Sequence, residues 1–138
     1  MDLERLRKRL IVEEGCELLP YRCTSDKLSI GVGRNLDERG ISHDTAMQML
    51  DEDIEICVGE LKQNLSFFDQ LPDEIQEMLC DLAFNMGVPR LMTFVKTLKL
   101  LKEGDYAAAA DELLESRYAS TLPARAGRNA DILRRHAR

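Results

Sequence analysis

The chain of 138 residues is long enough for one domain with its own hydrophobic core. Hydrophobic residues make up 44% and charged residues 32%, and no run of about 18 apolar residues occurs, which excludes a membrane-spanning protein. The formal net charge is −6, and the first residues mix charges without the apolar stretch of a signal peptide, which predicts a protein made in the cytoplasm.

The first element is predicted to be a helix that begins after Asp2 and runs to about Glu13. Asp2 is a favourable N-cap residue, because its carboxylate can accept from the free backbone N–H groups of the first turn. Gly15 is expected to end the helix in a left-handed conformation. The apolar residues at helical spacing are Leu3, Leu6, Leu10 and Ile11.

A short hairpin is predicted between this helix and residue 36, with strand-like residues 21–23 and 28–33 on either side of a turn at 24–27. Two strands are marginally stable without support. We therefore expect the hairpin to line a functional site, with Glu14 held across from it at the helix end.

The remainder of the chain is predicted to form five helices. The longest begins after Ser42 as its N-cap, and the next begins with Pro72 as its first residue and is closed by Gly87. The apolar stripe of the long helix comprises Ala46, Met49, Leu50, Ile54, Cys57, Val58, Leu61 and Leu65. The apolar face of the next comprises Ile75, Met78, Leu79, Leu82, Ala83 and Met86.

The last three helices are separated by proline, glycine and capping residues. Pro89 is expected to break the chain before an amphipathic helix that ends at Gly104, and Asp105 to cap the following helix. A turn at residues 121–123 precedes the final helix. The residues predicted to face inward from the first of the three are Leu91, Phe94, Val95, Leu98 and Leu101.

The four cysteines are 7, 34 and 23 positions apart, which does not fit the closely paired ligands of a zinc site. Cys57 and Cys80 fall on apolar helix faces, where a free thiol acts as a small hydrophobic group. Cys23 lies in the hairpin and is expected to be the most accessible of the four. His43 and His136 have no metal partner at useful spacing, and we expect neither a metal nor a cofactor.

Charge is distributed unevenly along the chain. Residues 116–138 contain six arginines and one acid, Asp131, which leaves a net −11 for the first 115 residues. This asymmetry fits either a basic face for a polyanion or a solvated arginine-rich helix. A helical nucleic-acid-binding module is thus one alternative, although the overall acidic charge opposes it.

Glu14 is a candidate general acid on physical grounds. A carboxylate at a helix C-terminus meets the negative end of the macrodipole, and partial burial against the hairpin would add to this effect. Both influences favour the protonated form, which suits proton donation. The neighbouring Glu13 points elsewhere and is expected to be exposed.

Glu14 is followed by eight residues, then Cys23, then five residues, then Ser29. This spacing, within EEG, PYRCT and LSIGVGRNL, resembles the catalytic signature of the phage-type lysozymes, the endolysins of glycoside hydrolase family 24. The later segments LAFNMG, FVKTL, GDYAAAA and PARAGR are also similar to that family, so the resemblance covers essentially the whole chain.

The resemblance implies a single α+β, mainly α domain over residues 1–138. It would have a small hairpin lobe at about 13–45, a long connecting helix, and a helical lobe formed by the remainder together with the N-terminal helix. The implied activity is hydrolysis of the β-1,4 bond between N-acetylmuramic acid and N-acetylglucosamine in bacterial peptidoglycan. The implied protein is a monomer that binds no nucleic acid and acts on the cell wall. A free phage endolysin, a prophage remnant and a secreted bacterial effector all stay open, and a free endolysin would need a holin-type pore to reach the wall.

The same resemblance assigns roles to individual residues. Glu14 would protonate the glycosidic oxygen, while Cys23 and Ser29 would hold and polarise the attacking water. Arg125 looks like the family's arginine near the catalytic glutamate and would pair with Glu14. Weaker candidates are Asn85 and Tyr118 as substrate contacts and Arg34 as a stabiliser of the hairpin.

Two positions depart from the commoner family pattern, in which Cys23 is aspartate and Ser29 is threonine. A thiol is a poor general base at neutral pH unless its pKa is lowered, so the chemistry of two carboxylates cannot be copied onto Cys23 unchanged. Water positioning, thiolate chemistry and a transient nucleophile all remain open for it. Asp26 is a second candidate carboxylate, although a turn residue is its expected role. A catalytically weak peptidoglycan-binding protein is the second alternative.

Overall fold

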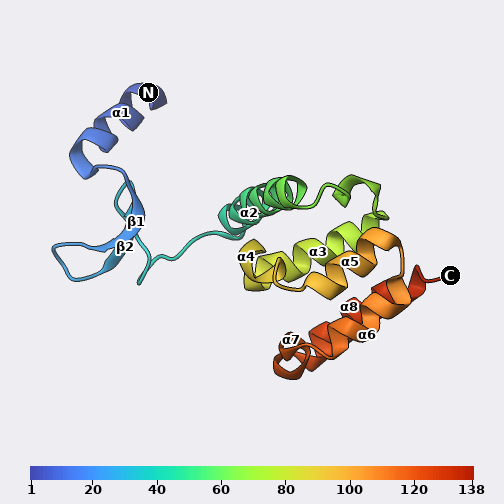
Figure 1. Ribbon diagram of the computed structural model, residues 1–138. Coiled ribbons are helices and arrows are strands. Elements are labelled where there is room, and N and C mark those ends of the chain that lie inside the picture. The colour runs from blue at the N-terminus through green and yellow to red at the C-terminus, as the bar shows by residue number, and fades with distance from the viewer. The chain divides into compact units, whose positions relative to one another are not determined.

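The computed structural model describes residues 1–138 and divides them into two compact units, Met1–Met49 and Leu50–Arg138. The mainly helical α+β class is confirmed, with eight α-helices and one three-stranded sheet (Figure 1). The first unit contains α1 (Leu3–Glu14), β1 (Glu17–Arg22), β2 (Leu28–Gly31), β3 (Arg34–Asn35) and the start of α2 (His43–Asn64). The division groups the N-terminal helix with the sheet, and its predicted assignment to the helical lobe stays a prediction.

The N-terminal helix α1 begins where the sequence predicts. The Asp2 carboxylate accepts a hydrogen bond of 3.0 Å from the backbone N–H of Arg5, which confirms the N-cap. Gly15 ends the helix with φ 75° and ψ −179°, so its backbone is positive in φ but extended in ψ. The predicted left-handed helical cap is therefore wrong in ψ, although a residue tolerant of positive φ is still required.

The hairpin is part of a small antiparallel sheet with the order β1-β2-β3. Tyr21 pairs with Ser29 and Ser29 with Asn35, so β2 lies in the middle. The register of β1 shifts between Glu17 and Tyr21, and the intervening residues, including Pro20, form an irregular stretch of this edge strand. The prediction of two strands was incomplete, because β3 adds a third.

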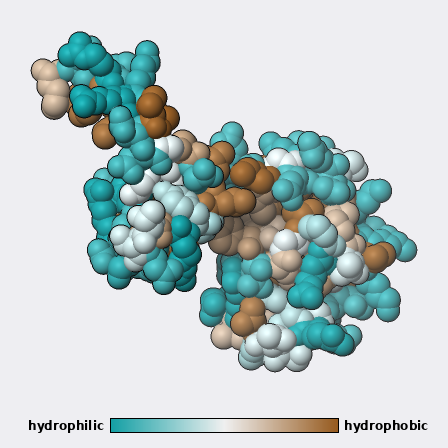
Figure 2. Space-filling model, turned by 90° about the vertical axis from the view of Figure 1, so that its left-hand side faces the viewer, coloured by the Kyte–Doolittle hydropathy of each residue, from teal (hydrophilic) through white to brown (hydrophobic).

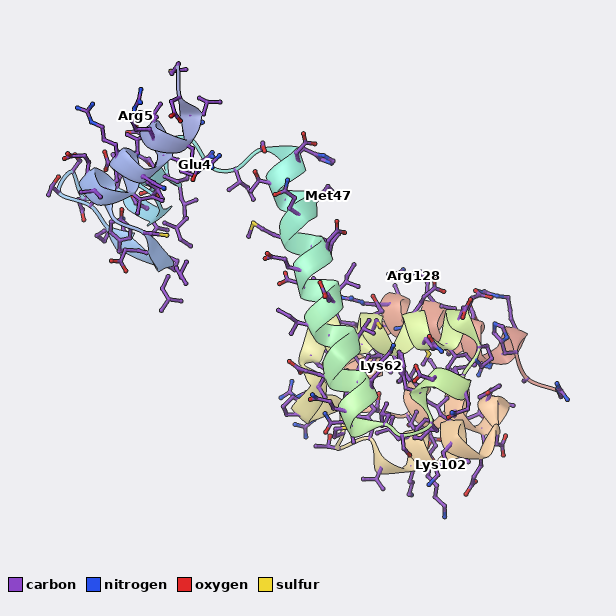
Figure 3. The ribbon with its side chains drawn as sticks, turned by 90° about the horizontal axis from the view of Figure 1, so that it is seen from above. Glu4, Arg5, Met47, Lys62, Lys102 and Arg128 are labelled. Carbon is purple, nitrogen blue, oxygen red and sulfur yellow. The ribbon has the colours of Figure 1, made fainter.

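The long helix α2 is confirmed at 22 residues. Ser42 precedes it, and its hydroxyl accepts from the backbone N–H of Thr45 at 3.1 Å, as expected of an N-cap. Met47 projects from the first part of this helix and Lys62 from the last (Figure 3). Burial begins only in the second half, at Cys57 and Leu61, so the first half of the predicted apolar stripe is not core.

The core belongs to the helical unit and is centred on α3 (Asp73–Met86). Pro72 is the N-cap of this helix and not its first residue, so the helix begins one residue later than predicted, and Gly87 closes it with φ 85°. The face predicted for α3 is confirmed, since Ile75, Met78, Leu79, Leu82 and Ala83 are buried.

The segment after α3 differs most from prediction. Pro89 lies in the first turn of a short helix, α4 (Val88–Leu91), because its missing N–H is not needed there. A separate helix, α5 (Val95–Glu103), begins four residues later and ends at Gly104. Val95 is 68% exposed at the start of α5, so its predicted burial was wrong.

The last helices pack closely on one another. Asp105 caps α6 (Tyr106–Leu114) through a 3.2 Å hydrogen bond from the backbone N–H of Ala108, as predicted. A short helix, α7 (Arg117–Thr121), replaces part of the expected turn before α8 (Pro123–Arg135). The helix α8 packs against α6, α7 and α3, and α6 and α8 lie side by side (Figure 1).

The surface residues bear on whether the protein could span a membrane or bind a polyanion through a basic face. Exposed apolar residues include Leu18 and Leu19 in the first unit and Phe84 in the second, and Figure 2 shows brown atoms gathered in one patch on the face that it presents as well as singly among teal ones. No helix is both long and apolar enough to serve as a membrane span. Three of the six C-terminal arginines form ion pairs with acids, through Arg125–Asp81, Arg134–Asp111 and Arg135–Glu74, which reduces the charge free to form a basic face.

Candidate active site

Glu14 is the last residue of α1, and its side chain lies against the backbone between β2 and β3. A Cβ atom added to Gly33 would stand 2.9 Å from Glu14 Oε2 and 3.3 Å from its carboxyl carbon. Gly33 has φ 65°, so the absence of a side chain both permits the turn and leaves room for the carboxylate. The structure thus places Glu14 beside the hairpin, as predicted, although Glu14 is exposed and the expected partial burial is not found.

Cys23 and Ser29 are brought together by the turn between β1 and β2. The backbone N–H of Cys23 donates to the carbonyl of Lys27 at 2.9 Å, and that of Asp26 donates to the carbonyl of Cys23 at 2.9 Å. Asp26 has φ 57°, a conformation that aspartate tolerates better than most residues, which fits its predicted turn role. Ser29 is 3% exposed and its hydroxyl donates to the carbonyl of Lys27 at 3.3 Å.

The surroundings of Cys23 lower the pKa of its thiol. Backbone hydrogen bonds from Lys27 and Ser25 have the largest effect and outweigh the opposing effect of burial, and the hydroxyls of Ser29 and Ser25 lower the pKa by smaller amounts. Each of these donors stabilises the thiolate more than the thiol. The departure from aspartate is therefore partly offset, because the thiol ionises more readily here than an ordinary cysteine.

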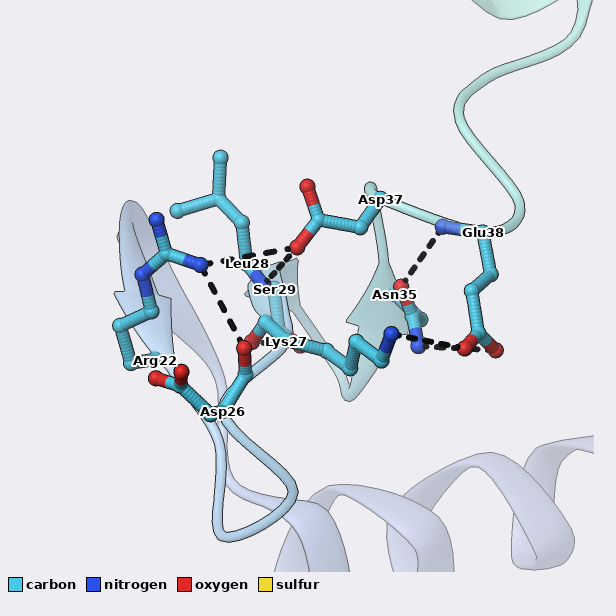
Figure 4. A network of polar contacts seen from close by, with 8 residues as sticks. All are labelled: Arg22, Asp26, Lys27, Leu28, Ser29, Asn35, Asp37 and Glu38. Carbon is cyan, nitrogen blue, oxygen red and sulfur yellow. Dashed lines mark hydrogen bonds and ion pairs between the residues drawn. The ribbon is translucent and has the colours of Figure 1, made fainter.

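A network of polar contacts holds the turn and the middle strand in place (Figure 4). Asp37, which follows β3, accepts from the backbone N–H of Leu28 at 2.7 Å and pairs with Arg22 at 3.6 Å. Lys27 pairs with Glu38 at 3.2 Å. These contacts tie β1, the turn and the start of β2 to the segment after the sheet, so the position of Ser29 does not depend on strand pairing alone.

The accessibility of the other thiols differs from expectation at one position. Cys16 is exposed, whereas Cys23 is only partly exposed, so the prediction that Cys23 is the most accessible thiol was wrong. Cys57 is buried and Cys80 partly buried, and burial raises the pKa of Cys57 and raises that of Cys80 to about 11. All four cysteines are free, and only Cys16 and Cys23 are suited to react with a thiol reagent.

Arg125 of α8 pairs with Asp81 of α3. Its Nε donates to Asp81 Oδ2 at 3.1 Å and its Nη2 to Oδ1 at 2.7 Å, a two-pronged geometry that is among the stronger side-chain contacts. This contact lowers the pKa of Asp81 and raises that of Arg125. Asp81 was not predicted from the sequence as a partner of Arg125, and the pairing of Arg125 with Glu14 stays a prediction.

Asn85 and Tyr118, the two predicted substrate contacts, line one cavity of about 710 Å³ in the helical unit. Apolar side chains such as Phe94 and Leu122 line it together with polar and charged ones. A mixed lining of this kind suits a ligand that carries both apolar faces and hydrogen-bonding groups. The structure thus brings Asn85 and Tyr118 to the same cavity.

The remaining candidates have local partners. Arg34 donates from Nη1 to the carbonyl of Gly40 at 3.4 Å, which supports its predicted role in stabilising the hairpin region. His136 contacts Glu74 at 3.0 Å, and Arg135 pairs with the same carboxylate. No group of three or more His, Cys, Asp or Glu side chains is placed to hold a metal ion.

Comparison with known proteins places these features in one family. The Phage lysozyme family model matches residues 12–138, which include Glu14, Cys23 and Ser29. A protein named probable T4-type lysozyme 1 from Dictyostelium discoideum is 25% identical over 158 aligned residues, covering 93% of this chain and 92% of the relative. Probable T4-type lysozyme 2 of the same organism is 24% identical over 152, covering 89% of each. The chain therefore belongs to the phage lysozyme family.

Proposed function

We propose that this protein is a muramidase that cleaves the β-1,4 bond between N-acetylmuramic acid and N-acetylglucosamine in bacterial peptidoglycan and thereby lyses bacterial cells. Family membership supports a lysozyme-type glycosidase. The observation that carries the proposal is the placement of the Glu14 carboxylate against Gly33, in the same unit as the adjoining Cys23 and Ser29.

In this mechanism Glu14 is the general acid. Its carboxyl proton passes to the glycosidic oxygen as the bond to the sugar carbon breaks, which prevents the build-up of an alkoxide on the leaving sugar. The close approach to Gly33 restricts where the carboxyl group can lie. A fixed acid is more effective than a mobile one because the proton must be delivered along one line.

Cys23 and Ser29 orient the water that attacks the sugar carbon. The hydroxyl of Ser29 has one proton, which it can donate either to the carbonyl of Lys27 or to the sulfur of Cys23, and its oxygen can accept from water in either case. The lowered pKa of Cys23 increases the fraction of thiolate, and a thiolate accepts hydrogen bonds more strongly than a neutral thiol. Thiol and hydroxyl thereby present two acceptors to one water molecule.

The helical unit supplies substrate binding in this proposal. Its cavity of about 710 Å³ is lined by Asn85 and Tyr118, whose amide and hydroxyl groups match the acetamido, hydroxyl and peptide groups of peptidoglycan. Arg125, held by Asp81, is the third supporting residue.

The experiment that tests this function compares Glu14→Gln with Glu13→Gln. Substitution of Glu14 removes the transferable proton and should slow lysis of chloroform-treated Gram-negative cells by a factor of about 10²–10⁴, whereas the neighbouring exposed Glu13 should be dispensable. Both variants should retain the wild-type unfolding transition. Near-wild-type lysis by Glu14→Gln would refute the mechanism.

Product analysis tests the bond that is cleaved. Purified peptidoglycan digested by the wild-type protein should yield new reducing ends on muramic acid, and reducing ends on glucosamine would contradict the proposed specificity. The alternative of a catalytically weak peptidoglycan-binding protein predicts co-sedimentation with peptidoglycan but no soluble fragments. Turbidity and sedimentation measured on the same sample separate the two functions.

A further inference from the structure

A partly buried polar network joins α3, α7 and α8 in the helical unit. The side-chain nitrogen of Asn129 donates to Asp81 Oδ2 at 2.9 Å and to Tyr118 Oη at 3.1 Å. Asn129 is 4% exposed, and Asp81 also holds Arg125 through two side-chain contacts. None of these contacts is local in sequence, because Asp81 precedes its partners on α8 by 44 and 48 positions.

The network has a defined direction of donation. The Arg125 guanidinium, with help from Asn129, keeps the pKa of Asp81 below its usual value, so this carboxylate is ionised and can only accept. The amide nitrogen of Asn129 must therefore face Asp81, and its second proton is directed to Tyr118. The oxygen of Tyr118 is consequently the acceptor in that bond.

The hydroxyl proton of Tyr118 is then free for another partner. Burial raises the pKa of Tyr118 above its usual value, so the hydroxyl stays protonated across the physiological range. Tyr118 lines the cavity of about 710 Å³, whereas Asp81 and Asn129 do not. Asp81 and Asn129 can therefore affect a ligand in that cavity only through the residues they hold.

We propose that Asp81 and Asn129 are positioning residues that fix Tyr118 as a hydrogen-bond donor to the peptidoglycan fragment bound in this cavity. The inference rests on the proposed function, because it names how that substrate is recognised. Hydroxyl, acetamido, peptide carbonyl and carboxylate oxygens of peptidoglycan are all acceptors that such a donor can meet. If the amide of Asn129 had the opposite orientation, its oxygen would accept the hydroxyl proton of Tyr118, and that proton would not be available to the substrate.

The test uses a double-mutant cycle on the hydrolysis of soluble peptidoglycan fragments. Tyr118→Phe deletes only the hydroxyl and should raise KM about two- to tenfold with kcat nearly unchanged, as expected for one hydrogen bond made equally in the ground and transition states. Asn129→Leu should raise KM by a similar factor. In the Tyr118→Phe background, Asn129→Leu should have no further effect on KM, because its partner hydroxyl is already absent.

Two further variants control for changes in stability and for failure of Asn129→Leu to fold. Gln76→Leu on α3 removes a partly buried amide that bonds to the carbonyls of Phe68 and Leu71, so it should lower stability without changing KM. Asn129→Ala replaces Asn129→Leu if the latter does not fold, and it should raise KM only when the Tyr118 hydroxyl is present, because it leaves the Asp81–Arg125 pair intact. Both controls separate a general loss of stability from loss of the donor.

The outcomes distinguish this inference from the proposed function. A wild-type protein that releases no fragments from peptidoglycan would overturn the function and the inference together. An active wild type with an unchanged KM in Tyr118→Phe would overturn the inference alone. Equal increases in KM from Asn129→Leu in both backgrounds would also overturn it, because Asn129 would then act independently of Tyr118.

Discussion

Replacing Gly33 with alanine adds one methyl group beside the carboxylate of Glu14. The new Cβ would lie 2.9 Å from Glu14 Oε2, closer than the 3.4 Å at which ordinary contact begins. The carboxylate is the far end of a flexible side chain, so it can move away by about 0.5 Å at little cost to folding. Gly31 offers a matched control, because it also has a positive φ (68°) but nothing lies within 4 Å of an added Cβ.

The two variants should lose similar stability but different activity. An alanine forced into the left-handed region costs about 1–2 kcal/mol at either position. A displacement of about 0.5 Å is large for a general acid, since a misplacement of about 1 Å can cost on the order of 10²-fold in rate. We therefore expect Gly33→Ala to lower kcat by roughly tenfold or more, and Gly31→Ala to change it by less than about threefold.

The assay combines urea unfolding with initial rates of peptidoglycan hydrolysis at a temperature where both variants are fully folded. Equal losses of kcat in Gly31→Ala and Gly33→Ala would refute the reasoning, because backbone strain would then explain both. Full activity of Gly33→Ala would show that the position of Glu14 beside Gly33 is not required for catalysis.

In a Cys16→Ser background, Cys23→Asp should keep or raise the lysis rate and should resist inactivation by iodoacetamide, whereas Cys23→Ala should lose most activity. If iodoacetamide inactivates the protein equally with and without the Cys23→Asp substitution, Cys23 has no role in catalysis. Alkylation of Cys23 should show a midpoint below pH 9.0, because its neighbours lower its pKa. The Asp81–Arg125 pair lowers the pKa of Asp81 from 3.8, so its stabilisation is present above about pH 4 and is lost as the pH falls through the lowered value. Asp81→Asn should therefore cost about 1–2 kcal/mol at neutral pH, allowing for solvent screening, and less in acid, and a pH-independent cost in urea unfolding would contradict this. Leu79→Ala in the core should cost about 2–5 kcal/mol and Val95→Ala less than about 0.5, and equal costs would place Val95 in the core after all.

Local signals in the sequence were sufficient for most helices. Asp2, Ser42 and Asp105 cap helices where predicted, since an N-cap is defined by one side chain and the next three residues. Pro89 was misread because proline both ends a helix and favours a first turn, and only the neighbouring structure decides between these roles. Val95 was then assigned to the wrong face, because α5 begins later than the predicted helix.

The candidate site was predictable only in part. The hairpin with Glu14, Cys23 and Ser29 was indicated by spacing within a run of glycines and turn residues. Strand β3 has two residues, too few for any periodic pattern, and was missed. Asp81 resembles any acid on the polar side of a helix, and its partners come from more than 40 positions later, so no local pattern identifies the network.

The irregular stretch of β1 also affects how molecules of this protein meet one another. Strand β1 is an edge of the sheet, and Leu18 and Leu19 are 83% and 78% exposed on it. An exposed apolar edge with free N–H and C=O groups is a template for pairing with a second chain. Pro20 has no N–H to offer, and the shifted register bends the strand at the same place. The break in β1 thus protects a small sheet from intermolecular pairing, which would matter most under the proposed function, where many molecules gather on insoluble peptidoglycan.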